Sequence, residues 1–414
     1  MSDDQSASPS RRAFLAGAAV IGAATAATAA TTAGAQTPNE INPIEGDKGG
    51  TILGPRNRAI EQQNPDILRP PPTDNGTIPN LKFSFADAHV KMRDGGWSRE
   101  ITARELPISK TMAGVNMRLN KGGVRELHWH IPAEWSFMIA GHARITAVDN
   151  NGDNFVADVG PGDLWYFPKG IPHSIQGLSD DGCEFLLAFP DGNFSEDSTF
   201  AITDTFAHMP KEVLAKNFGF DISALDKIPT KEKFIFSAPL PPQALPADTV
   251  GSGSGAAPLR MTFRLMQQEP IRAPGGVVRI VDTRNFAIAS DVAAALVEVN
   301  PGHMREIHWH PLNDEWQYYI SGKGRMTVFA ASAQARTFDY QAGDVGYVPQ
   351  SMPHYIENTG TEPLRFFELF AGPRFEDVSL TQWMALTPHE LVVEHLNINR
   401  DLIDALPKNK RPVV

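Results

Sequence analysis

The chain has 414 residues, of which 42% are hydrophobic and 21% charged, and its formal net charge at pH 7 is −11. This length exceeds what one hydrophobic core usually serves, so two domains are the simplest expectation. An acidic surface without a Lys/Arg block argues against nucleic acid as a partner. No apolar run after residue 35 is long enough to span a membrane, and a single cysteine, Cys183, excludes an internal disulfide.

The first 35 residues have the pattern of an export signal. Arg11 and Arg12 precede a mildly apolar, alanine-rich stretch that ends in Ala33-Gly34-Ala35, a small-residue cleavage pattern. The segment resembles a bacterial twin-arginine signal, and an ordinary Sec signal is the alternative. It predicts a periplasmic or secreted protein whose signal occupies residues 1–35.

Two stretches of biased composition divide the rest of the chain. Residues 36–82 are rich in Pro, Asn and Gly, which favours extended or disordered backbone, so we expect an N-terminal arm there. Residues 237–258 are first Pro-rich and then Gly/Ser-rich, as in a linker. The two expected domains are therefore 83–236 and 259–414.

Both domains show the same order of predicted elements. Short β-branched and aromatic runs alternate with turn residues in "HARITAVD", "NFVADV" and "GDLWYFP", and again in "GRMTVFAA", "ARTFDY" and "GDVGYVP". A helical pattern with Pro near its start follows at 209–219 and at 387–397. We therefore expect an all-β protein with two β-barrel or jelly-roll domains in tandem, each followed by a short helical segment, that arose by duplication.

A histidine-rich motif occurs once in each domain, in "RELHWHIPAEW" (125–135) and "REIHWHPLNDEW" (305–316). Side chains two apart on a strand share a face, so His128 and His130 point to the same side. Glu134 follows closely, and His173 ends the segment "PGDLWYFPKGIPH". Three imidazoles and one carboxylate fill four positions of an octahedron and leave two adjacent positions open. The second domain offers the same order of residues: His308, His310, Glu315 and His354.

Repetition is what makes this pattern informative. A lone H-x-H pair is a weak signal, because surface strands carry such pairs by chance. Here six of the chain's 12 histidines fall in the two sets. We therefore predict one metal site in each domain, although affinity order alone would favour copper or zinc over manganese.

The ligands and the turn residues around them resemble both motifs of the cupin superfamily, once in each domain. The matching residues are Gly122, His128, His130, Glu134, Gly141, Gly162, Pro168, Gly170 and His173, and then Gly302, His308, His310, Glu315, Gly322, Gly343, Pro349, His354 and Asn358. Gly177 and Ser351 depart from the motifs, but neither supplies a ligand. The resemblance covers the chain from about residue 80 and implies a bicupin with a divalent metal in each β-barrel.

Among bicupins, the segments "EWQYYISGKGRMTVF", "QAGDVGYVP" and "FPDGNFSEDSTF" resemble the bacterial oxalate decarboxylases. Those enzymes convert oxalate to formate and carbon dioxide with manganese, and dioxygen is a cofactor. The resemblance thus implies two Mn²⁺ ions per chain, dioxygen as a cofactor, oxalate as a small-molecule substrate, and a homo-oligomer. Oxalate oxidase is the nearest alternative enzyme, and a non-enzymatic storage-type bicupin is the alternative of another class.

The resemblance also implies catalytic roles for four further residues. In the family a lid folds over the first metal; its sequence here is Ser195-Glu196-Asp197-Ser198, in which Glu196 would handle the proton. Arg125 would stabilise the charged intermediate. In the second domain, Arg305 matches Arg125, and Glu368 matches a glutamate also assigned as a proton donor. The second metal is therefore either catalytic or structural and electron-storing.

The two copies also differ in detail. Leu187 is the counterpart of Glu368, Glu376 aligns with Glu196, and Phe375 stands where the family has a tyrosine. By strand parity Trp129 and Trp309 point away from the metals, which favours a packing or interface role for both.

Two expectations concern the first site in particular. Strict alternation from His128 places Glu126, not Arg125, on the metal face, so the role of Arg125 requires a bulge or a strand that starts after it. Asp197 replaces the asparagine of the family's lid. Its charge should raise the pKa of Glu196; the alternative is a solvated carboxylate without effect.

Overall fold

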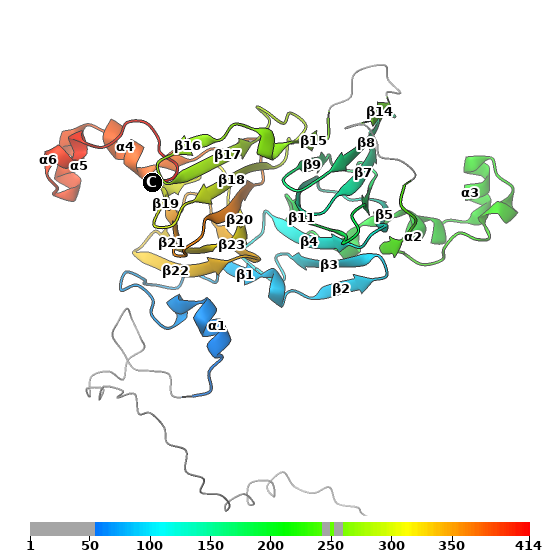
Figure 1. Ribbon diagram of the computed structural model, residues 1–414, viewed down its shortest axis with the longest axis horizontal. Helices are drawn as coiled ribbons and strands as arrows, with labels where there is room; N and C mark the ends of the chain where they lie inside the picture. Colours follow the sequence, from blue (N-terminus) through cyan, green and yellow to red (C-terminus); the bar gives the residue numbers. More distant parts are fainter. Residues whose placement is uncertain (1–53, 242–248, 252–259) are drawn as a thin grey trace, which may run out of the picture.

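The structure, a computed structural model, describes residues 54–241, 249–251 and 260–414. The expected export signal at 1–35, the first part of the expected arm and most of the expected linker lie outside these residues. Within the described part of the chain, no helix combines the length and apolarity needed to cross a membrane. The described residues form two β-rich units that lie side by side (Figure 1).

Two antiparallel sheets build the first unit. One has the strand order β12-β5-β10-β7-β8-β14, with β13 also paired to β5, and the other has the order β15-β9-β6-β11-β4-β3-β2. Their strands are β2 (Val90–Arg93), β3 (Gly96–Ile101), β4 (Ala113–Leu119), β5 (Gly123–Trp129), β6 (Glu134–Ala140), β7 (Ala143–Val148), β8 (Asn154–Val159), β9 (Leu164–Phe167), β10 (His173–Gly177), β11 (Cys183–Phe189), β12 (Phe200–Ala201), β13 (Ile235–Ser237), β14 (Thr249–Gly251) and β15 (Thr262–Phe263).

The second unit repeats this plan with sheets of order β1-β23-β20-β25-β18-β17-β16 and β22-β21-β24-β19-β26. Its strands are β1 (Lys82–Ser84), β16 (Ile271–Ala273), β17 (Gly276–Val281), β18 (Ala293–Val299), β19 (Met304–Trp309), β20 (Glu315–Ser321), β21 (Lys323–Ala330), β22 (Gln334–Gln341), β23 (Asp344–Val348), β24 (His354–Asn358), β25 (Leu364–Phe370) and β26 (Val378–Ser379). All six runs predicted as strands are strands, and the expectation of two β-rich domains in tandem is confirmed.

The sheets do not close into barrels, which corrects that part of the expectation. Each unit consists of two separate sheets, and two of the sheets gain an edge strand from a distant part of the chain. β1 pairs with β23 of the second unit, and β15 pairs with β9 of the first. An added strand satisfies the edge hydrogen bonds that barrel closure would otherwise satisfy.

The described part of the N-terminal arm docks on the second unit. It contains α1 (Arg58–Gln63), and the backbone of Asn75 pairs with that of Ala335 in β22. The Asp74 carboxylate accepts hydrogen bonds from the backbone and hydroxyl of Thr337, at 2.9 and 2.7 Å. This segment is therefore packed structure, whereas its composition favoured extended or disordered backbone.

One hydrophobic core joins the two units. The Phe367 ring lies edge-on to Trp135 and Phe137, with ring centroids 5.2 and 4.7 Å apart. All three residues are buried together with Trp316 and Tyr318 of the second unit. The strands of this face, such as β6 and β11, are buried along nearly their whole length because both of their faces are covered.

Helices follow each unit, as the two predicted segments indicated. The segment 209–219 contains α3 (Lys211–Phe218), and 387–397 contains α5 (His389–Leu396); each helix has Pro at its N-cap. Gly219 and Asn397 end them in the left-handed conformation, at φ 70° and 51°. The sequence did not predict α1, α2 (Ile202–Ala207), α4 (Leu380–Leu386) or α6 (Arg400–Asp404).

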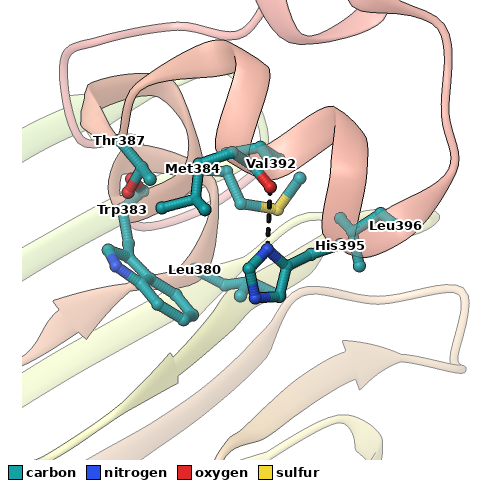
Figure 2. Close-up of a pocket in the computed structure, with 8 residues that line it drawn as sticks. Leu380, Trp383, Met384, Thr387, Val392, His395 and Leu396 are labelled. Atoms are coloured by element: carbon teal, nitrogen blue, oxygen red, sulfur yellow. Dashed lines mark hydrogen bonds between the residues drawn. The ribbon is translucent and has the colours of Figure 1, made fainter.

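The helical tails lie at opposite ends of the molecule, α2 and α3 beyond the first unit and α4–α6 beyond the second (Figure 1). Trp383, Met384, Leu391 and Leu396 line an apolar groove between α4 and α5 (Figure 2). Trp383 is 57% exposed, and its ring meets Trp309 edge-on at 5.8 Å.

Replacing Phe367 with alanine should destabilise both units, because the ring fills the core between them. We expect the free energy of unfolding to fall by about 3–5 kcal/mol, measured by urea denaturation. Phe329→Ala, at a residue that is 47% exposed, serves as the control and should change it by less than about 1 kcal/mol. An unchanged urea midpoint for Phe367→Ala would contradict a shared core.

Candidate metal centres and lid

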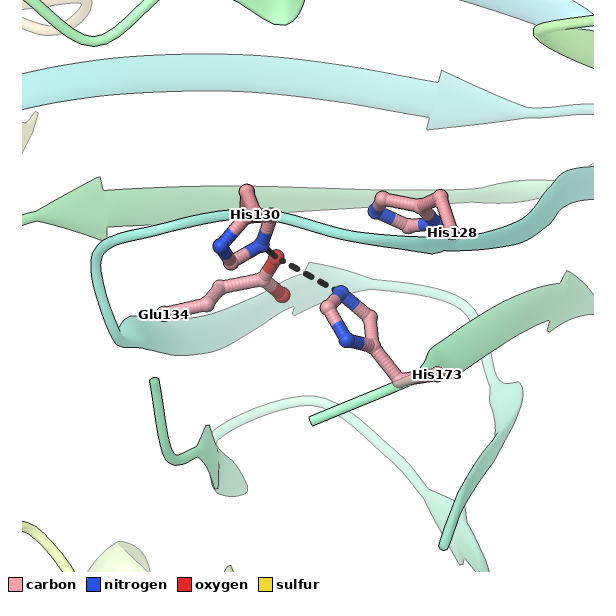
Figure 3. Close-up of side chains that lie close together, drawn as sticks. All are labelled: His128, His130, Glu134 and His173. Carbon is pink, nitrogen blue, oxygen red and sulfur yellow. Dashed lines mark hydrogen bonds and ion pairs between the residues drawn. The ribbon is translucent and has the colours of Figure 1, made fainter. Parts of the chain in front are cut away.

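The two predicted ligand sets each converge on one point inside a unit. In both sets the four ligand atoms lie within 4.8 Å of one another, and all eight side chains are buried. In the first set His128 lies on β5, His130 follows that strand, Glu134 begins β6 and His173 begins β10 (Figure 3). The second set has the same placement on β19, β20 and β24: His308, His310, Glu315 and His354.

Hydrogen bonds orient the imidazoles of the first centre. Each Nδ1 lies 2.7 Å from a backbone carbonyl oxygen, that of Glu126 for His128, Pro132 for His130 and Ile171 for His173. An Nδ1–H that donates to a carbonyl leaves Nε2 as the free ligand atom, a common arrangement behind metal-binding histidines. The ring orientation therefore fits a metal ion.

The carboxylate of the first centre is oriented in the same way. Ser136 and Trp165 donate to Oε1 of Glu134, at 3.0 and 3.3 Å. Its Oε2 is left facing Nε2 of His130 and His173, at 3.3 and 3.4 Å. One carboxylate oxygen is thus held by the protein and the other is directed into the centre.

The second centre repeats this arrangement with different neighbours. Gln317 donates to Oε1 of Glu315 at 2.8 Å, and Oε2 lies 3.0 and 2.8 Å from Nε2 of His310 and His354. Within the described residues, Oε2 of Glu315 and Nε2 of His308, His310 and His354 are buried and have no hydrogen-bond partner. Buried polar atoms of this kind are costly unless a ligand satisfies them, so this centre also fits a metal ion.

Burial and neighbouring charges set the ionisation of the ligands. Burial, together with Arg125, holds the pKa of His128 well below its usual value, and burial also lowers the pKa of His173. Burial alone would raise the pKa of Glu134, but its hydrogen bonds with His130 and His173 lower it below the usual range. Neutral imidazoles and a charged carboxylate are the forms that bind a metal.

A β-bulge brings Arg125 to the same side as the ligands. His128 pairs with His173 and Arg125 pairs with Ile175, so three residue steps along β5 oppose two along β10. The same shift separates His308 from Arg305 in the second unit. Strict alternation therefore fails here, and the bulge that the role of Arg125 required is present.

The lid covers the first centre and places Glu196 beside Arg125. Glu196 is buried in a short 3-10 helix (Glu196–Ser198), and its Oε2 lies 3.4 Å from Nη2 of Arg125. Thr199 accepts a hydrogen bond from Arg125 at 3.0 Å and donates to the backbone carbonyl of Glu196. Burial raises the pKa of Glu196, Arg125 lowers it and Glu100 raises it again, with a net increase. A carboxyl with a raised pKa suits proton transfer.

Two contacts outside the centre hold the lid closed. The Glu100 carboxylate accepts a hydrogen bond from the backbone N–H of Glu196 at 2.9 Å. Asp197 points outward, with its side chain 75% exposed, and forms an ion pair with Lys91 at 2.6 Å. Burial is the main cause of the raised pKa of Glu196. The charge of Asp197, which was expected to raise this pKa, is instead paired with Lys91.

The arginine of the second unit, Arg305, has different partners from Arg125. Arg305 is fully buried, with Nε 2.9 Å from Glu368 and Nη2 2.7 Å from Asp377. Burial would lower the pKa of Arg305, but these two carboxylates raise it above its ordinary value. Glu376, which aligns with Glu196, is exposed. The counterpart of the lid therefore brings no free carboxylic acid over this centre.

Several residues of the site were not predicted from the sequence. Asp377 could have been found as the residue aligned with Asp197, and Thr199 as part of the lid motif. Glu100 and Lys91 lie on other strands and carried no motif. Trp129 stacks on Phe200 at 5.6 Å and Trp309 meets Trp383 edge-on. These contacts agree with the packing role expected as one alternative for both residues, and an interface role stays a prediction.

Loss of one ligand imidazole should abolish metal binding at its own centre and leave metal binding at the other centre intact. We expect His128→Ala and His308→Ala each to lower bound metal from about two ions per chain to about one, and the double variant to bind none. Elemental analysis of the purified proteins measures this. His208→Ala, at an exposed histidine outside both sets, is the control, and an undiminished metal content in both single variants would contradict the two centres.

Comparison with known proteins agrees with this geometry. The family model described as "Cupin" matches residues 84–225 and 263–403. The oxalate decarboxylase OxdC of Bacillus subtilis (strain 168) is 56% identical over 377 residues, which cover 91% of this chain and 97% of that protein. A probable oxalate decarboxylase of Arthroderma benhamiae is 41% identical, with coverage of 89% and 92%.

Solved structures give the same result. The structure of the B. subtilis oxalate decarboxylase at pH 4.6 aligns with a TM-score of 0.86 at 54% identity, covering 92% of this chain and 99% of that one. A structure from work on the Mn(II) centres of that enzyme has the same TM-score and identity, with coverage of 90% and 98%. The chain belongs to the cupin superfamily and, within it, to the two-domain oxalate decarboxylase family.

Proposed function

We propose that this protein decarboxylates oxalate to formate and carbon dioxide, with Mn²⁺ in both centres and dioxygen as a cofactor. The observation that carries the proposal is Glu196, a buried carboxyl held 3.4 Å from Arg125 beside a complete set of metal ligands. The high identity to named oxalate decarboxylases supports the choice of substrate, and the Mn(II) centres of the B. subtilis enzyme support the choice of metal.

The residues of the first centre have distinct roles in this proposal. His128, His130, Glu134 and His173 would hold the ion, which supplies a Lewis-acid position for a carboxylate oxygen and a one-electron redox couple when bound. Arg125 would stabilise the negative charge of the substrate as the reaction proceeds. Glu196 would take the acid proton of oxalate and return a proton to the carbon that becomes formate. The closed lid excludes water while this occurs.

The asymmetry of the two arginines favours the first centre as the decarboxylating one. Arg305 already pairs with Glu368 and Asp377, so little of its charge is free for an anion. The side chain of Arg125 has one carboxylate within ion-pair distance among the described residues, that of Glu196. We assign the second centre a structural or electron-storing role, with Arg305 and Glu368 as its buried ion pair.

Two further proposals concern the protein outside its centres. We infer that it is exported to the periplasm or secreted, on the basis of the segment 1–35. We also infer a homo-oligomer, supported by the exposed apolar side chains of the helical tails, among them Trp383, Leu386 and Leu402.

Glu196→Gln tests the decarboxylase proposal, because it keeps the shape of the side chain and removes the proton. Formate production from oxalate at mildly acidic pH should fall by about 10² or more, the usual size of a lost general acid–base group. Metal content should stay the same, and hydrogen peroxide production should persist or increase, since oxidation needs no proton at carbon. Glu357→Gln, at an exposed residue of β24, is the control. Formate production at the wild-type rate would contradict this role of Glu196 and would indicate that decarboxylation takes place at the second centre, with Glu368 as the proton donor.

The export proposal is tested by changing both arginines of the signal. Arg11→Lys combined with Arg12→Lys should leave a folded, metal-bound precursor in the cytoplasm, because the twin-arginine route requires the pair. Fractionation followed by immunoblotting locates the protein. Normal export of the double variant would favour an ordinary Sec signal instead.

A further inference from the structure

Phe234 is a strained residue next to the first centre that neither the cupin motifs nor the lid explains. It directly precedes β13, is fully buried, and has a left-handed backbone conformation with φ 60°. A bulky aromatic residue rarely adopts this conformation, and such strain persists only where the surroundings enforce it.

The backbone of Phe234 is tied to the bulge that carries Arg125. Its carbonyl oxygen accepts from the N–H of Glu126 at 3.0 Å and from Nη1 of Arg125 at 3.4 Å. Its N–H donates to Oε1 of Glu126 at 2.8 Å, while Thr203 donates to Oε2 of the same carboxylate at 2.7 Å. Both backbone polar groups of Phe234 are thus used, and they enforce its left-handed conformation.

The ring of Phe234 lies near three cations, of which Lys91 and Arg125 are closest and Arg93 is 5.7 Å from the ring centroid. The guanidinium carbon of Arg125 is 4.4 Å from the ring centroid, and Nζ of Lys91 is 3.8 Å from it. Lys91 is the same residue that forms an ion pair with Asp197 of the lid. In a buried site a cation–π contact attracts the cation without neutralising its charge.

The second unit provides an internal comparison at Pro412. Its carbonyl accepts from the N–H of Glu306 at 3.1 Å and from Nη1 of Arg305 at 3.3 Å, the same two bonds that Phe234 makes. Proline has no N–H to donate, and Oε1 of Glu306 is buried with no hydrogen-bond partner in the described part of the chain. Among the residues that the structure describes, no aromatic ring lies over the Arg305 guanidinium, which is held by two carboxylates instead.

We propose that Phe234 is a positioning residue for Arg125, holding the guanidinium toward Glu196 through its carbonyl and its ring while leaving the positive charge available to an anionic substrate. The proposal rests on the decarboxylase function proposed above. On this proposal, the two centres differ in function partly because one position differs. Phe234 places an aromatic ring beside Arg125, whereas the equivalent residue beside Arg305 is Pro412, and Arg305 pairs with two carboxylates.

The test compares variants of the full, metal-loaded protein with oxalate as substrate. Phe234→Leu removes the ring and keeps an apolar side chain; we expect kcat/KM to fall by about 10-fold, the size of a desolvated cation–π contact. Phe234→Tyr restores an aromatic face and should recover activity to within about 3-fold of wild type. Phe236→Leu is the matched control, because its ring faces Lys233 at 4.4 Å and not Arg125; it should have no effect.

Metal content and melting temperature separate positioning from folding. Should Phe234→Leu fail to fold, Phe234→Met takes its place as a flexible apolar side chain. Activity of Phe234→Leu within about 2-fold of wild type, equal losses in Phe234→Leu and Phe234→Tyr, or an equal loss in Phe236→Leu would each overturn the proposal. A wild-type protein that makes no formate would overturn the proposed function instead, and oxalate binding to the same variants by calorimetry would then decide the role of Phe234.

Discussion

Burial of polar ligands inside a pair of sheets is the constraint on which the rest of the structure depends. Each unit places three imidazoles and a carboxylate where water cannot reach them, and such groups must be satisfied by partners. The backbone carbonyls behind each Nδ1, and the donors to Oε1 of Glu134 and Glu315, satisfy the outward-facing atoms. The inward-facing atoms are left to a metal ion, so binding of the ion and stability of the core are linked.

The ligands could be predicted from the sequence because their spacing follows directly from strand geometry. Side chains two apart share a face, and a turn of a few residues returns the chain with Glu134 to the same point. The arginine could not be placed in this way, because the bulge in β5 changes the parity between Arg125 and His128. Phe234, Glu100 and the edge strands β1 and β15 were also beyond prediction, since each depends on contacts between segments far apart in the chain.

Duplication gave both units the same scaffold, and the charges around the arginine distinguish them. Position 187 is Leu in the first unit, whereas its counterpart Glu368 forms a buried ion pair with Arg305 in the second. A buried arginine between two carboxylates has its charge compensated and its geometry fixed, which suits a structural centre. Arg125 lies beside one carboxyl, Glu196, whose pKa is raised, and is otherwise held by a ring, a hydroxyl and a carbonyl, so more of its charge is left for a ligand.

The same contacts connect lid closure with the orientation of Arg125. In the structure, three contacts join the lid to this cluster: Asp197 pairs with Lys91, Glu196 lies beside Arg125, and the Thr199 hydroxyl accepts a hydrogen bond from the same guanidinium. Lys91 and Arg125 both lie against the Phe234 ring, whose backbone is held by Glu126. A lid that opens therefore removes three contacts from this cluster at once, whereas the contacts between Phe234, Glu126 and Arg125 do not involve the lid. Arg125 can then stay oriented toward the centre while the lid admits an anion, which shortens the rearrangement needed on closure.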